Sequence, residues 1–158
     1  MSYTTNENSY ADLEVSEIAA ADQLINPLCR EVFDYWAGKR DAGELQQLDP
    51  IDVPTVIPYL VIIEVGQDPH QFTFRFAGQG IVEISALDLT GKPCGEEAPI
   101  TFGTCKDVVE TKKPVHAAGR LVFRHPGKTY LFEETIGLPV TDRDGRVEKI
   151  WLLHGPIL

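Results

Sequence analysis

The sequence contains few basic residues, and those it has are scattered. Its 158 residues include 14 Lys and Arg against 24 Asp and Glu, which gives a formal net charge of −10 at pH 7. Proteins that bind nucleic acids or anionic lipids concentrate positive charge to neutralise phosphates. The longest basic runs here are the pairs Lys39–Arg40 and Lys112–Lys113. We therefore expect no direct binding to nucleic acid or to a membrane.

Cysteine is also scarce. The chain has three, Cys29, Cys94 and Cys105, and no two of them stand in a C-x-x-C spacing. An odd number without that spacing, and without a neighbouring Cys/His cluster, argues against a disulfide framework and against a structural zinc site. We expect reduced thiols and no bound metal.

Long apolar runs and catalytic motifs are missing as well. The apolar run Tyr59–Ile63 has the length of a strand, far short of the roughly 18–20 residues that a membrane helix needs. The N-terminal residues are polar and lack the segments of a signal peptide, so we expect a cytoplasmic protein. We find no nucleophile-elbow, phosphate-loop or zinc-protease motif, and we expect a protein that is not an enzyme and has no catalytic residue.

What the sequence does contain fits one domain. Residues 1–23 are predicted to be a flexible or helical extension, with a helical pattern that starts at Ser16, and residues 24–158 a single domain. Asn26 followed by Pro27 is a typical helix start, because Asn caps well and Pro suits the first helical position. A helix is therefore predicted from Pro27 to about Gly38.

Five later segments have the pattern of strands. In residues 71–77 the period of two places Phe72, Phe74 and Phe76 on one face. Two short helices are expected between the second and third strands, at about 81–87 and 101–113. Hairpins on either side of a helical segment predict an α+β fold, with a five-stranded antiparallel sheet, short helices on one face and N-terminal helices. The predicted strands are residues 59–65, 71–77, 115–124, 129–140 and 147–154.

Six short motifs follow one another along the chain: Phe33–Trp36, Leu48–Pro54, Ile57–Leu60, Phe74–Phe76 with Gly78, Asp88–Gly91 and Val109–Pro114. In this order and spacing they resemble a family of short bacterial PAS-like proteins. The resemblance implies the PAS fold and a sensing or binding role, and it implies no catalytic residue. A basic, proline-containing stretch usual after the first motif is replaced here by residues 39–47, which are mixed in charge.

Two cofactors deserve comparison with the sequence. Gly91 and Cys94 match the spacing of the flavin-bonding cysteine motif of light-sensing PAS domains, but Pro93, Gly95 and Ala98 replace its Asn, Arg and Gln. A haem-binding PAS domain usually offers a histidine from a helix, and residues 101–113 contain none. We expect no cofactor, and we expect Cys94 to be a loop cysteine.

Glu133 and Glu134 are neighbours on a predicted strand, so they are expected to point to opposite faces. They cannot act together as an acid–base pair. If either turns inward, it needs a partner such as Arg75, Arg120 or a ligand.

Aromatic and aliphatic residues of the predicted sheet and helices are candidates for the lining of an apolar pocket. The alternative is that they simply fill the core. The candidate ligand-binding residues are Phe74, Phe76, Ile81, Ile84, Phe102, Val109, Phe123, Phe132 and Trp151.

The helix before the sheet suggests self-association. Leu28, Val32, Tyr35 and Trp36 form an apolar stripe, and a stripe without a sheet to cover it favours a homodimer. The leading interpretation is a stand-alone sensory or regulatory module that binds a small apolar ligand or a partner protein and signals to a separate protein. The alternatives are a dimerisation or adaptor module with a filled core, and a small enzyme or carrier for a small apolar acid.

Overall fold

The computed structural model describes residues 9–18, 20–68, 70–85, 88–95, 98–122 and 131–157. Its strands form one sheet in which all neighbours are antiparallel, in the order β1-β5-β6-β7-β2-β3-β4. The strands are β1 (Ser9–Glu17), β2 (Leu60–Val65), β3 (Phe72–Ala77), β4 (Pro93–Cys94), β5 (Val115–Val122), β6 (Leu131–Thr141) and β7 (Val147–Ile157).

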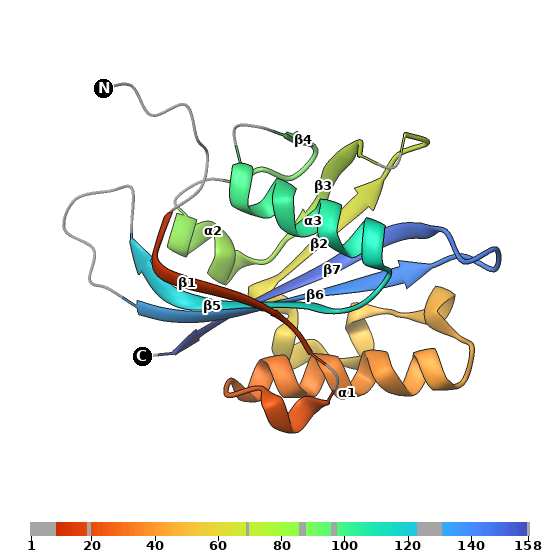
Figure 1. The fold of residues 1–158 in the computed structure, drawn as a ribbon, viewed down its shortest axis with the longest axis horizontal. Coiled ribbons are helices and arrows are strands. Elements are labelled where there is room, and N and C mark those ends of the chain that lie inside the picture. Colours follow the sequence, from red (N-terminus) through yellow and green to blue (C-terminus); the bar gives the residue numbers. More distant parts are fainter. Residues whose placement is uncertain are drawn as a thin grey trace.

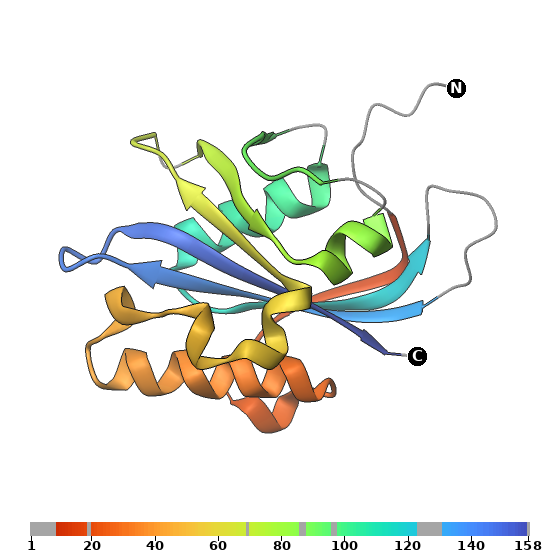
Figure 2. The same ribbon diagram turned by 180° about the vertical axis from the view of Figure 1, so that it is seen from behind.

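Helices cover both faces of this sheet. One face carries α1 (Pro27–Asp41) with the 3-10 turns η1 (Ala21–Gln23), η2 (Leu45–Gln47), η3 (Pro50–Asp52) and η4 (Pro54–Tyr59); the other carries α2 (Gln79–Ser85) and α3 (Pro99–Thr111). The orange α1 and the green α2 and α3 lie on opposite sides of the strands in Figures 1 and 2. The sheet is therefore buried on two sides, and its central strands are apolar on both.

Strand β7 shows how one strand serves two cores. Trp151 and Leu153 pack with α1, whereas Ile150 and Leu152 pack with α3. The two faces alternate because successive side chains of a strand point to opposite sides. We name the two cores the α1-side core and the α3-side core.

The predicted α+β class is confirmed, and all five predicted strands are present. The sheet has seven strands rather than five, because β1 and β4 extend its two edges. The two-residue β4 pairs with β3 and is too short to leave a periodic pattern.

The predicted flexible or helical extension, with its helical pattern from Ser16, is wrong for residues 9–17. Residues Ser9–Glu17 form β1, which pairs with β5. Leu13 and Val15 of β1 stay exposed, so the strand is specified by ladder hydrogen bonds to a distant segment rather than by a buried apolar face. The predicted looseness of residues 1–8 lies outside the described residues.

Helix α1 begins where the sequence predicts. The Asn26 side chain accepts hydrogen bonds from the backbone N–H groups of Leu28 and Cys29, which are two of the four donors that a helix start leaves unpaired. The helix then extends to Asp41, three residues beyond the predicted end at Gly38.

The reason given for a homodimer through α1 does not hold, because α1 covers the sheet of its own chain. Val32 and Trp36 are buried in the α1-side core, and Leu28 and Tyr35 pack against it. The indole N–H of Trp36 donates to the backbone carbonyl of Pro139 at 2.8 Å. The apolar stripe is thus used within the chain.

Among the described residues, no helix combines the length and the apolar character that a bilayer crossing requires.

Candidate functional site

Four of the nine candidate ligand-binding residues come together on one face. Phe74 is buried in the α3-side core, and Ile81, Phe102 and Val109 pack against the same core from α2 and α3. The structure therefore gathers residues from β3 and from both helices in one core, and their role in binding a ligand stays a prediction.

Two candidates lie on the opposite face. Phe76 packs against the α1-side core, and Trp151 is buried in it. The expectation that Phe72, Phe74 and Phe76 share a face is wrong, because Ile62 pairs with Phe76 and Ile63 with Phe74. Arg75 is the extra residue of a β-bulge, and a bulge shifts the alternation by one position.

The remaining three candidates are not tested by the structure. Phe123 lies outside the described residues, and the side chains of Ile84 and Phe132 are likewise not described.

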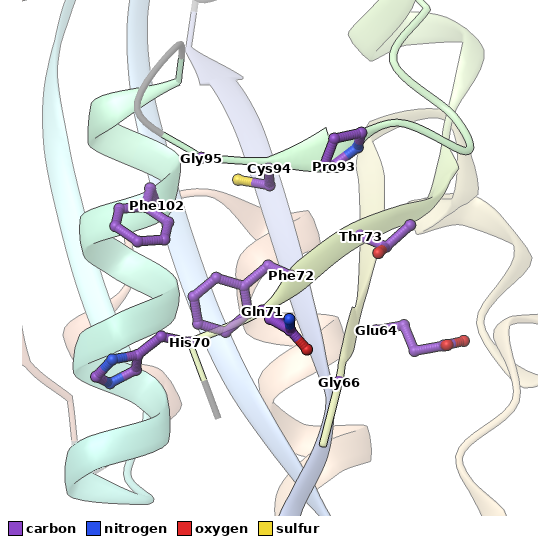
Figure 3. Close-up of a pocket in the computed structure, with 10 residues that line it drawn as sticks. All are labelled: Glu64, Gly66, His70, Gln71, Phe72, Thr73, Pro93, Cys94, Gly95 and Phe102. Carbon is purple, nitrogen blue, oxygen red and sulfur yellow. The ribbon is translucent and has the colours of Figure 1, made fainter. Parts of the chain in front are cut away.

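A pocket of about 420 Å³ opens between α3 and the β2-β3-β4 edge of the sheet. Figure 3 shows its lining with α3 on one side and β3 and β4 on the other. Among the described lining residues, only Phe102 belongs to the candidate set. The described lining consists of Glu64, Gly66, His70, Gln71, Phe72, Thr73, Pro93, Cys94, Gly95 and Phe102.

The floor of this pocket is aromatic. The rings of Phe72 and Phe102 lie 5.7 Å apart at 71° in an edge-to-face contact, a favourable geometry for two aromatic rings. Cys94 is opposite Phe72 in the β3-β4 pairing and is only 3% exposed. The expected loop cysteine is thus part of a strand, with its sulfur on the pocket side in Figure 3.

The rim of the pocket is polar, and its charged groups are paired. The carboxylate of Glu64 accepts from Arg75, with 2.7 Å to Nη2 and 3.0 Å to Nε. His70 Nε2 lies 3.5 Å from a carboxylate oxygen of Glu110. The uncharged side chains of Gln71 and Thr73 complete the rim.

Two buried carboxylates form a second polar feature on β6. Glu134 is fully buried and faces α1, whereas Glu133 is 3% exposed. Each meets a histidine: His116 Nε2 lies 3.0 Å from Glu134, and His154 Nδ1 lies 2.9 Å from Glu133. The predicted opposite orientation is confirmed, but the partners include histidines. Arg75, one suggested partner, pairs with Glu64 instead.

Glu134 fastens the start of α1 to the sheet. Its oxygens accept from the backbone N–H groups of Ile25 at 3.0 Å and Asn26 at 2.7 Å. The hydroxyl oxygen of Ser16, a residue of β1, lies 3.2 Å from Nδ1 of His116. Burial alone would raise the pKa of Glu134, but the hydrogen bonds from Asn26, Ile25 and His116 outweigh it and hold that pKa below its ordinary value.

Glu133 belongs to a cluster on the other face of β6. Its carboxylate lies 3.0 Å from the hydroxyl of Thr135, which in turn lies 3.2 Å from His154. Thr135 lies directly opposite His154 in the β6-β7 pairing. The cluster could therefore be found from the sequence only if the register of these two strands were known.

Comparison with known proteins places this fold. A family model described as a PAS domain matches residues 25–145. None of the curated protein sequences compared with the chain matches it.

Solved structures with this fold include light-oxygen-voltage domains. One, from a flavin-analogue study of the domain's mechanism, has a TM-score of 0.50 and 14% identity over 68% of this chain and 83% of its own. An RNA-binding light-oxygen-voltage receptor has a TM-score of 0.50 and 12% identity over 93% of this chain and 38% of its own. At these identities the likeness concerns the fold alone.

The matched segment includes α1, the strands β2 to β6, and the helices α2 and α3. PAS domains are typically sensory modules and not enzymes. Since the family model covers most of its length, the chain belongs to the PAS domain family.

Proposed function

We propose that this PAS domain is a sensory module that binds a small, largely apolar ligand in the pocket between α3 and the β3-β4 edge. The observation that carries the proposal is the aromatic floor of Phe72 and Phe102 in a pocket of about 420 Å³. Small-molecule sites have volumes of roughly 300–1,000 Å³, with apolar linings and a few polar groups.

The pocket is placed to couple ligand binding to a movement. Its lining comes from α3 through Phe102 and from the sheet through Phe72 and Cys94. A ligand that contacts both sides and prefers one packing of α3 on the sheet shifts the population toward it. We propose that a separate partner protein recognises this change. A homodimer would require a surface other than the inner face of α1.

We also propose a reducing, cytoplasmic setting for this function. All three cysteines are free thiols, and free buried thiols are usual where glutathione keeps cysteine reduced.

The alternative of a carrier for a small apolar acid has little support. The described lining of the pocket contains the carboxylate of Glu64 and neither Lys nor Arg, which disfavours an acid. The likeness to an RNA-binding receptor is a likeness of fold and does not imply that this chain binds RNA. Its net charge of −10 opposes binding to phosphates.

The first test is native mass spectrometry of the purified chain with a UV–visible spectrum of the same sample. An added mass without visible absorption supports a colourless apolar ligand. An added mass with absorption near roughly 400–450 nm, where flavin and haem absorb, would overturn the expectation of no cofactor. A bare mass would favour the adaptor interpretation.

Matched variants locate the ligand. Phe102→Ala removes part of the pocket floor, whereas Val109→Ala truncates a residue of the same helix and the same core that does not line the pocket. We expect Phe102→Ala to lose the added mass and Val109→Ala to keep it. Equal retention in both variants would place the ligand elsewhere.

A further inference from the structure

Strand β1 lies at one edge of the sheet. It pairs with β5 on one side, and among the described strands none pairs with its other edge. Figure 1 shows the red β1 running beside β5. An edge strand presents backbone N–H and C=O groups that can pair with a further strand. The outer edge of β1 is therefore a place where a second chain can extend the sheet.

The regular part of this edge is residues 14–17. Asp12 and Leu13 together stand opposite Gly119 and form a bulge, whereas residues 14–17 pair one to one with residues 115–118. A bulge protects an edge against further pairing, but this one ends before Glu14. Residues 14–17 are all exposed, so they combine a regular backbone with open side chains.

The side chains of residues 14–17 alternate between the two faces of the sheet. Ser16 contacts His116 on the α1 side. Glu14 shares that side, and Val15 and Glu17 point to the other, because successive residues of a strand alternate. Val15 is 57% exposed, so a chain that covers it removes apolar surface from water.

Charge determines which chain suits this edge. Strand β1 contains Asp12, Glu14 and Glu17 and neither Lys nor Arg. A second copy paired antiparallel over residues 14–17 would set Glu14 of one chain opposite Glu17 of the other. Like charges directly opposite each other destabilise a strand pair, whereas opposite charges stabilise it. The edge therefore disfavours its own copy and favours a basic chain.

We propose that the outer edge of β1 binds an extended basic segment of a partner protein, antiparallel to residues 14–17. All neighbouring strands of the sheet are antiparallel. The segment has Lys or Arg opposite Glu14 and Glu17, and a β-branched residue opposite Val15. Read from its N-terminus, it has the pattern basic, polar, apolar, basic. This inference goes beyond the proposed function, because the segment binds whether or not the pocket holds a ligand.

The test is an NMR titration of the full chain with the peptide acetyl-Thr-Lys-Thr-Val-Lys-Thr-amide. We expect it to shift the backbone amide signals of residues 14–17 and to slow hydrogen exchange of the outward-pointing amides among them. Two control peptides have either Glu in place of both lysines or N-methyl groups on the amides that would pair with β1. Each control should bind at least about tenfold more weakly.

Matched charge reversals locate the site on the protein. Glu14→Lys with Glu17→Lys reverses the charge of the edge. Asp34→Lys with Asp107→Lys changes the net charge equally, at exposed positions of α1 and α3. We expect the first pair to weaken binding of the lysine peptide by about tenfold and the second to change it by less than about twofold. The first pair should also gain binding of the glutamate peptide, which a β1 that had merely lost its structure would not do.

Several outcomes would overturn the proposal. Equal binding of the N-methylated peptide would show that the ladder is not used, and equal weakening by both double variants would show that only the total charge matters. Unchanged amides in β1 would mean that the edge is simply protected. If residues 14–17 become protected as the protein concentration rises without peptide, the occupant is a second copy. None of these results bears on a ligand in the pocket, which native mass spectrometry tests separately.

Discussion

Glu133 and Glu134 are neighbours in β6, and each carries its carboxylate into a different buried face of the sheet, where it meets a different histidine. A buried charge is tolerated only when it is paired and hydrogen-bonded. Glu134 meets this condition with backbone donors at the start of α1. Strand β6 thereby fixes the position of α1 on one side and takes part in a polar cluster on the other.

Replacing Glu134 by Ala is expected to lower the free energy of unfolding by about 3–4 kcal/mol, because it leaves buried N–H groups at Ile25 and Asn26 without their acceptor. Glu134→Gln keeps a carbonyl acceptor, so we expect it to cost about half as much. Urea unfolding followed by circular dichroism measures both.

The matched control is Glu64→Ala, which removes an exposed ion pair with Arg75. Exposed pairs contribute about 0–1 kcal/mol. Equal losses for the two alanine variants would show that the hydrogen bonds at the start of α1 contribute little.

The same carboxylate predicts how stability depends on pH. The pKa of Glu134 is lower in the folded chain than its ordinary value of 4.5. A group with a lowered folded pKa contributes stability that is present above its unfolded pKa and is lost as pH falls through the folded value. The stability difference between the wild type and Glu134→Gln should therefore shrink as pH falls below about 4.5. Urea midpoints from about pH 7 to about pH 3 measure this difference, and a constant difference would contradict the assignment.

Much of the fold is predictable because its signals are local. The capping pair Asn26 and Pro27 predicts the start of α1, and β-branched or alternating segments predict the five principal strands. The opposite orientation of Glu133 and Glu134 follows from the strand period alone. These features depend on neighbours in sequence, which is why they can be derived without a structure.

The rest depends on pairing between distant segments. The bulge at Arg75 moves Phe76 to the other face, and no local pattern reports a bulge. Strand β1 is set by its pairing with β5. Of the candidate pocket residues whose side chains the structure describes, only Phe102 reaches the pocket of Figure 3, because the pocket lies at the edge formed by β4 rather than over the centre of the sheet.

Gly155 and Asn26 make a close contact that tolerates no added atom. A Cβ at position 155 would lie 2.5 Å from Cγ of Asn26. We expect Gly155→Ala to cost about 2–3 kcal/mol. Asn26→Ala alone loses the helix cap, at about 1–2 kcal/mol. The double variant should cost clearly less than the sum, by about 1–2 kcal/mol.

Gly137→Ala is the control for this cycle. Its Cβ would lie 3.2 Å from side-chain methyl groups of Leu152 and Val108, a milder overlap than the one at position 155, so we expect a smaller cost of about 1 kcal/mol. This change should be additive with Asn26→Ala. If the stability losses of Gly155→Ala and Asn26→Ala simply add, the contact between these two residues does not determine the cost of Gly155→Ala.

The three cysteines should differ in reactivity. Burial, followed by the nearby carboxylate of Glu134, raises the pKa of the Cys29 thiol well above its usual range, and only the thiolate reacts rapidly. Cys29 and Cys105 are fully buried, whereas Cys94 lines the pocket. In the folded chain at about pH 8, iodoacetamide should modify Cys94 slowly and the other two more slowly still. Peptide mass spectrometry at timed intervals measures the order.

A urea-unfolded sample, in which all three react alike, is the control. If Cys29 reacts as fast as Cys94 in the folded chain, α1 opens from the sheet far more readily than its packing indicates.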